Sequence, residues 1–90
     1  MYQSEEECRR QTINRIHRIQ GQLAALEKNV AANDPCEAVV VQARAIEKAM
    51  ASLISHVFQS YLDHQAKDQM ELNADQASQN IARIFGLINR

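Results

Sequence analysis

The sequence predicts an all-α protomer of three helices, in which two long helices form an antiparallel hairpin and a short third helix follows. Three observations predict this fold class. The 90 residues are 46% hydrophobic, yet they include no tryptophan, only two glycines and only one proline. Apolar residues recur at alternating intervals of three and four along most of the chain, which is typical of amphipathic helices. A single short joint, residues 34–36, separates the two longest periodic stretches.

The first helix is expected over residues 5–33. Ser4 followed by Glu7 fits a capping box, and three consecutive glutamates suit the positive end of a helix dipole. Residues 1–3 are expected to be disordered. Gly21 costs about 1 kcal/mol relative to alanine in a helix interior, so we expect another helix to approach closely there. The apolar seam of this helix consists of Thr12, Ile16, Ile19, Leu23, Leu26 and Val30.

The joint between the two long helices is Asp34-Pro35-Cys36. Asp34 is expected to be the N-cap and Pro35 the first helical residue, which places Cys36 in the first turn of the second helix. A helix N-terminus carries partial positive charge and unpaired N–H groups, and both favour a thiolate over a thiol. Cys36 is therefore the candidate detector of a chemical signal. The alternative is a small buried residue at a helix start.

The second helix is expected over residues 35–66, followed by a connection over residues 67–74 and a third helix over residues 75–88. The apolar arc of the second helix is wide, which indicates packing on more than one side and makes this helix the expected dimer core. Its seam consists of Val39, Ala43, Ile46, Met50, Leu53, Val57 and Tyr61. The apolar side of the third helix consists of Ala77, Ile81, Ile84, Phe85 and Ile88.

A single domain over residues 1–90 built from long helices has little volume for a core, so we expect self-association into a homodimer with a four-helix bundle. No apolar run approaches the ~18–20 residues of a membrane span, and the start does not resemble a signal peptide. We therefore expect no membrane partner and a cytoplasmic location, where thiols stay reduced. The two cysteines, Cys8 and Cys36, are too few for a disulfide framework.

A short turn between two long helices makes them antiparallel. Folding the chain at its joint places Cys8 level with about residue 59. If two hairpins pair antiparallel through their second helices, Cys36 of one chain approaches residues 58–65 of the other. We therefore expect a site between subunits, where Cys36 meets four residues of the partner subunit. Those four residues are Cys8, Tyr61, His64 and His56.

The formal net charge is −1, but the basic residues are not evenly distributed. Arg9, Arg10, Arg15 and Arg18 lie in the first helix with His17 beside them. An oligomer would repeat this basic face, and such a face is able to bind DNA. An ordinary solvated helix face is the alternative.

Three stretches of the sequence carry a resemblance to a known family. They are Arg15-Ile-His-Arg-Ile-Gln-Gly-Gln-Leu23, Cys36 thirteen residues further on, and Ala49-Met-Ala-Ser-Leu53. From about residue 9 to residue 66 the chain resembles the CsoR/RcnR/FrmR family of bacterial repressors. The resemblance implies all-helical dimers that assemble into disc-like homotetramers. It also implies binding to operator DNA through basic residues, and release when copper, nickel, cobalt, formaldehyde or a persulfide engages the cysteine.

The family's sensing positions agree only in part with this sequence. The family's cysteine matches Cys36. The next position is histidine in metal and formaldehyde sensors and cysteine in persulfide sensors, and here it is Tyr61. The fourth position, often cysteine or histidine in metal sensors, is Gln65, while His64 lies about 100° around the helix from it. Tyrosine and glutamine are not usual ligands of soft metals. Formaldehyde sensors carry an N-terminal proline, and this chain begins Met1-Tyr2.

For contact with double-stranded DNA we expect a stripe at i, i+3 and i+7 on the first helix, formed by Arg15, Arg18 and Gln22. Arg44 and Lys48, at i and i+4 on the outer face of the second helix, extend the stripe. Most of these contacts would be to phosphate, so binding should weaken steeply with salt.

The favoured interpretation is a repressor that senses thiol-reactive or sulfur species through Cys36, with Cys8 as the second thiol of a disulfide or polysulfide bridge. An alternative within the family is a metal sensor that holds Cu, Ni, Co or Zn through Cys36, His64 and His56. An alternative of another class is a helical protein-interaction module with incidental cysteines. No enzyme is expected, because no nucleophile and base are arranged as in a catalytic cleft.

Overall fold

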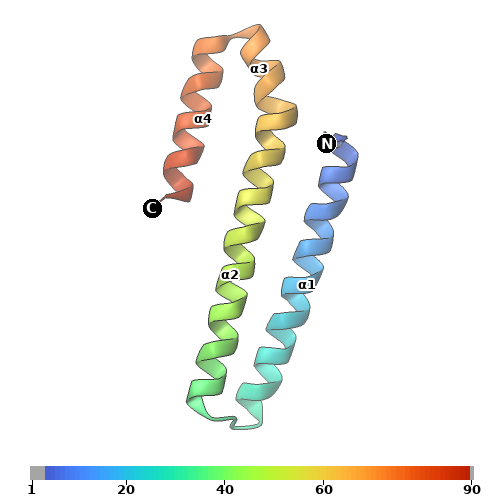
Figure 1. Ribbon diagram of the computed structural model, residues 1–90, viewed down its shortest axis with the longest axis vertical. Helices are drawn as coiled ribbons and strands as arrows, with labels where there is room; N and C mark the ends of the chain where they lie inside the picture. Colours follow the sequence, from blue (N-terminus) through green and yellow to red (C-terminus); the bar gives the residue numbers. More distant parts are fainter. Residues whose placement is uncertain (1–3, 90) are drawn as a thin grey trace. The chain divides into compact units, whose positions relative to one another are not determined.

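The computed structural model describes residues 4–89, which are helical apart from the turns that join the helices (Figure 1). The expectation for residues 1–3 lies outside the described residues. No strand occurs in the described part of the chain, so the all-α prediction is confirmed. The segments in order are α1 (Glu5–Ala31), α2 (Cys36–Tyr61), the π-helical η1 (Leu62–Ala66), α3 (Lys67–Leu72) and α4 (Ala74–Ile88).

The chain forms two compact units, and α2 contributes to both of them. The first unit ends at Leu53 and contains α1 with most of α2. The second unit begins at Ile54 and contains the last turns of α2 together with η1, α3 and α4. Within residues 4–89, no helix combines the length and the apolar character that a membrane span requires.

The start of α1 is as predicted. Ser4 is the N-cap, and its hydroxyl accepts a hydrogen bond from the Glu7 backbone N–H at 3.1 Å. The helix ends at Ala31 rather than at residue 33, because Asn33 has a φ of 59°, in the left-handed region. The Asn33 N–H donates to the Val30 carbonyl and the Asp34 N–H donates to the Asn29 carbonyl. These two bonds form a Schellman motif, which satisfies carbonyls that the helix end leaves unpaired.

The second long helix begins at Cys36, one residue later than predicted. The Val39 N–H donates to the Pro35 carbonyl at 3.1 Å, so Pro35 is the residue that accepts the first bond of the helix. The Asp34 backbone N–H closes the end of α1 instead. Cys36 is nevertheless in the first turn of α2, as the sequence predicted.

The predicted end of the second helix at residue 66 and the predicted connection over residues 67–74 are wrong. The backbone stays helical from Cys36 to Leu72, through η1 and α3, and only Asn73 interrupts it before α4. The Asn73 N–H donates to the Gln69 carbonyl, while its side chain accepts from the Gln76 N–H at 3.1 Å. A π-helical turn contains more residues than an α-helical turn, so the apolar period shifts in phase at η1. In the sequence, this break in the regular apolar spacing has the same pattern as the end of a helix.

In the first unit, α1 and α2 run antiparallel, as predicted (Figure 1). Two hydrogen bonds join them: Asn29 Nδ2 donates to Gln42 Oε1 at 2.7 Å, and Arg15 Nη1 donates to Ser52 Oγ at 3.0 Å. Ile19 of α1 and Ile46 of α2 are buried. The contacts between α1 and α2 therefore hold the first unit together.

The predicted seam of α1 is only partly buried. Ile19 is buried and Leu26 is half-buried, whereas Ile16, Leu23 and Val30 are 38–54% exposed. The exposed three are spaced by seven residues, so they form a second apolar stripe beside the one that faces α2. Apart from its chain neighbours and the backbone of its own helical turns, no atom of the described chain lies within 4 Å of a Cβ placed on Gly21. The close helix contact expected at Gly21 is therefore absent from the described part of this chain.

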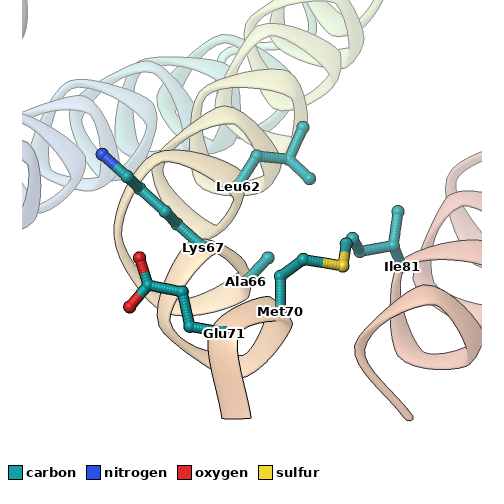
Figure 2. Close-up of a pocket in the computed structure, with 6 residues that line it drawn as sticks. All are labelled: Leu62, Ala66, Lys67, Met70, Glu71 and Ile81. Atoms are coloured by element: carbon teal, nitrogen blue, oxygen red, sulfur yellow. The ribbon is translucent and has the colours of Figure 1, made fainter. Parts of the chain in front are cut away.

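In the second unit, α4 folds back along η1 and the end of α2. The Phe58 and Phe85 rings lie 6.2 Å apart at an angle of 42°, a separation typical of aromatic pairs. Ala66 of η1 and Ala77 of α4 are the most deeply buried residues, at 3% and 0% exposure. Small residues at these positions allow the two helices to approach closely, and Ala66 lines a pocket together with Met70 of α3 and Ile81 of α4 (Figure 2).

The described chain buries little of its apolar surface. Only five of its residues, all apolar, are buried: Cys8, Ile19, Ile46, Ala66 and Ala77. Large apolar side chains remain exposed on every long helix, and Leu72 at the end of α3 is 87% exposed. Exposed apolar side chains that gather into a patch commonly mark a surface that another protein covers.

Candidate functional site

Cys36, the candidate detector, is the first residue of α2 and is exposed. Its exposure argues against the alternative of a small residue buried at a helix start. The backbone N–H groups of a first helical turn have no partner within the helix and attract an anion. The Cys36 sulfur is therefore placed where it can meet a reagent from solvent.

Cys8 differs from Cys36 in its surroundings. It lies in the second turn of α1 and its exposure is only 6%. Its carbonyl accepts a hydrogen bond from Thr12 Oγ1 at 2.8 Å. From Cys8 to Ala31, α1 extends for roughly 35 Å at 1.5 Å per residue, and Cys36 follows only after the turn. A disulfide requires Cα atoms within about 7 Å, so these two thiols of one chain cannot pair.

The remaining candidate sensing residues lie at and around η1 in the second unit. Tyr61 ends α2, and its hydroxyl donates to Gln69 Oε1 at 3.3 Å while its ring stacks on Phe58 at 6.4 Å. His56 and His64 are both half-buried, His64 within η1. Because η1 is π-helical, successive side chains there do not follow the 100° step assumed from the sequence.

A metal site of three or more His, Cys, Asp or Glu side chains does not form within residues 4–89. The predicted metal ligands were Cys36, His64 and His56, with the histidines supplied by a second chain. Cys36 belongs to the first unit and both histidines to the second.

The expected DNA-contact residues of α1 lie together around one hollow on the first unit. The hollow has a volume of about 360 Å³, and it is lined by four residues of α1 and two small residues of α2: Arg15, Arg18, Ile19, Gln22, Ala49 and Ser52. Arg15 is half-buried and is hydrogen-bonded to Ser52, while Arg18 and Gln22 are exposed. Ser52 lies 37 residues from Arg15 in the sequence, and no sequence pattern signalled their contact.

Two other arginines, Arg9 and Arg44, have carboxylate neighbours. Arg44 Nη1 lies 2.7 Å from Glu47 Oε1, and Arg9 Nη2 lies 3.9 Å from Glu5 Oε1. All four side chains are more than half exposed, so each pair stabilises the fold by less than about 1 kcal/mol. Within residues 4–89, neither Arg15 nor Arg18 forms such an ion pair. Their positive charge is thus the least compensated of the arginines on α1 and α2 that were expected to contact DNA.

Comparison with known proteins gives one finding about the whole chain. The model of a family described as "Metal-sensitive transcriptional repressor" matches residues 8–90. The match includes both cysteines, Tyr61, His64 and every expected DNA-contact residue. The family description names no particular metal. No solved structure matches the chain significantly.

Proposed function

Because the chain belongs to the family of metal-sensitive transcriptional repressors, we propose that it is a cytoplasmic repressor that releases operator DNA when Cys36 reacts or binds a ligand. The family match over residues 8–90 is the observation that carries this proposal. The family is one of repressors rather than of enzymes. The proposed activity of the protein is therefore to bind duplex DNA, and the proposed role of Cys36 is to sense the effector.

The hollow on the first unit supports a DNA interface at Arg15, Arg18 and Gln22. The two guanidinium groups have no carboxylate partner within residues 4–89, so contact with phosphate does not require them to give up an ion pair. Arg44, which is paired with Glu47, and Lys48 extend the basic surface along α2. Phosphate contacts release counterions from DNA, so affinity should fall linearly on a log–log plot against salt.

This interface is tested by an Arg15→Gln/Arg18→Gln double variant in a fluorescence-anisotropy titration with duplex DNA at several salt concentrations. We expect affinity to fall by at least about tenfold and the salt slope to fall by about two per engaged chain. Arg9→Gln/Arg10→Gln is the matched control, because Arg9 already faces Glu5, and we expect it to have a much smaller effect. Unchanged affinity in the Arg15/Arg18 variant would contradict the interface.

The favoured effector class is a thiol-reactive sulfur species. Cys36 is exposed, and the positions where metal sensors of the family carry further ligands are Tyr61 and Gln65. A polysulfide transfers a sulfane sulfur to the Cys36 thiolate and leaves as a shorter polysulfide. The thiolate of Cys8 of the partner subunit then attacks the Cys36 sulfur of that persulfide, forming a disulfide and expelling hydrosulfide. Since Cys8 is 6% exposed, this second step requires the first turns of α1 to open.

A metal effector is the second candidate, and the family description favours it directly. Cys36 would supply a thiolate, and His64 and His56 of a second chain would supply imidazole nitrogens. Thiolate and imidazole together suit Cu, Ni, Co or Zn. A bound metal in this arrangement would cross-link two chains through their α2 and η1 segments.

Both effector schemes require self-association, because each joins Cys36 to residues of a second chain. We propose that the exposed apolar side chains of α1 and α2 are covered by further copies of this chain, first in a homodimer and then in a homotetramer. Symmetric repetition of the Arg15/Arg18 hollow would match an inverted-repeat operator. A protein-interaction module remains the alternative, and it predicts that the chain binds no duplex DNA at any salt concentration.

A further inference from the structure

Arg15 is held differently from the two arginines that lie beside carboxylates. Its Nη1 donates to Ser52 Oγ at 3.0 Å, so a side chain of α1 is fixed by a side chain of α2. Arg44 and Arg9, in contrast, face the carboxylates of Glu47 and Glu5. The acceptor at Arg15 is an uncharged hydroxyl, which restrains the guanidinium without neutralising it.

We propose that Ser52 is a positioning residue for DNA binding, which holds the Arg15 guanidinium at the edge of the hollow in the orientation that meets a DNA phosphate. This inference rests on the proposed function and extends it to a residue outside the basic set. A guanidinium has five N–H donors in a fixed fork, and the bond to Ser52 uses one of them. The remaining donors are available for a bidentate contact with phosphate oxygens.

The surroundings of the hollow fit this role. Ala49 lies one turn before Ser52 on α2, and its small side chain leaves the space in front of Arg15 open. Arg18 stands one turn after Arg15 on the same face of α1 and adds a second positive charge. The hollow of about 360 Å³ is therefore lined by the restrained Arg15 guanidinium, the exposed Arg18 guanidinium and the Gln22 amide.

Fixing a long side chain before binding reduces the entropy that binding costs. Immobilising one flexible side chain corresponds to roughly a 2- to 10-fold change in affinity for each engaged copy. Ser52→Ala should therefore weaken DNA binding by that factor, while the salt slope stays unchanged because Arg15 still reaches its phosphate. Ser52→Thr keeps the hydroxyl and should restore the parent affinity. Ser52→Asp introduces a carboxylate and should lower both the affinity and the salt slope.

The experiment uses the full chain and a fluorescent duplex that the parent protein selects from a random library. Affinity and salt slope are measured for Ser52→Ala, Ser52→Thr and Ser52→Asp, and for Ser52→Ala combined with Arg15→Gln. We expect Ser52→Ala to have no further effect when Arg15 is already Gln, which a merely structural role would not produce. Circular dichroism on each variant confirms that the helices are intact.

Three results would overturn the inference: parent-like affinity in Ser52→Ala, the same loss with and without Arg15, or failure of Ser52→Thr to restore binding. In each of these the parent still binds DNA, so the proposed function stands. If the parent selects no duplex at all, the proposed function itself fails, and the role of Ser52 fails with it.

Discussion

The two cysteines differ in their exposure to solvent, and neither forms a disulfide within residues 4–89. Cys36 is exposed at the first position of α2, and Cys8 is 6% exposed within α1. A reagent in solvent therefore meets Cys36 first. Any bridge must join different chains, because the length of α1 separates the two thiols of one chain. We therefore propose that chemistry at this one exposed sulfur decides whether the effector acts.

We expect Cys36→Ala to bind DNA with an affinity within about twofold of the parent and to be insensitive to the effector. Because Cys36 is exposed, its loss should remove only sensing. The measurement is DNA release monitored by anisotropy during separate titrations with sodium tetrasulfide, Cu(I), Ni(II), Co(II) and Zn(II). Release that persists in the variant with the effector that works on the parent would remove Cys36 from the sensor.

Cys8→Ala is the companion variant, and its readout is independent of DNA. After tetrasulfide treatment the parent should show a covalent dimer in non-reducing mass analysis, and Cys8→Ala should not. A covalent dimer that persists without Cys8 would show that Cys36 pairs with another Cys36.

For the individual helices, capping residues predicted where a helix begins better than the spacing of apolar residues predicted where it ends. The capping box at Ser4 and Glu7 and the helix start at Asp-Pro-Cys were predictable, because neighbouring residues determine them. The end of α1 was misjudged by two residues. Asparagine adopts a positive φ more often than most other residues, but its presence alone does not show that a helix ends there. The helix over residues 67–72 was missed because η1 displaces the apolar stripe without ending the helix.

Asn33 offers a direct test of how α1 ends. Its φ of 59° costs an alanine roughly 1–2 kcal/mol, whereas glycine adopts it freely. We expect Asn33→Ala to lower the free energy of unfolding by roughly 1 kcal/mol, a fall in Tm of about 4–8 °C. Asn33→Gly is the control and should stay close to the parent. Equal stability of the alanine and parent proteins in urea titrations would contradict the left-handed turn.

For the whole molecule, the sequence predicted that apolar residues line one side of each helix. It did not predict which of these residues pack within the chain and which stay exposed. The sequence placed Arg15, Arg18 and Gln22 on one face from their spacing, and the structure brings them to one hollow. It gave no sign of Ser52, because only the packing of α1 on α2 shows which residues 37 positions apart meet. The exposed set on α1 was mistaken for the buried seam because two apolar stripes lie side by side.

The exposed stripes lead to a prediction about assembly. Met50 of α2 is 41% exposed in the isolated chain, and a glutamate there would place a charge in an apolar contact between copies. We expect Met50→Glu to shift the protein to a smaller species in sedimentation velocity and to weaken DNA binding. Ala45→Glu, at another exposed position of α2, is the matched control. A parent chain that sediments as a monomer would contradict the assembly.

The π-helical turn η1 also affects how this chain is compared with its relatives. One residue more per turn means that positions beyond Leu62 rotate relative to those of an uninterrupted α-helix. A residue after this point therefore points in a different direction from the aligned residue of a relative whose helix is α-helical throughout. Gln65 is such a residue. In protein engineering, deleting a single codon within residues 62–66 should convert the π-helical turn into an ordinary α-helical one and leave the later side chains of α3 in their present direction, because the wider turn accommodates one extra residue.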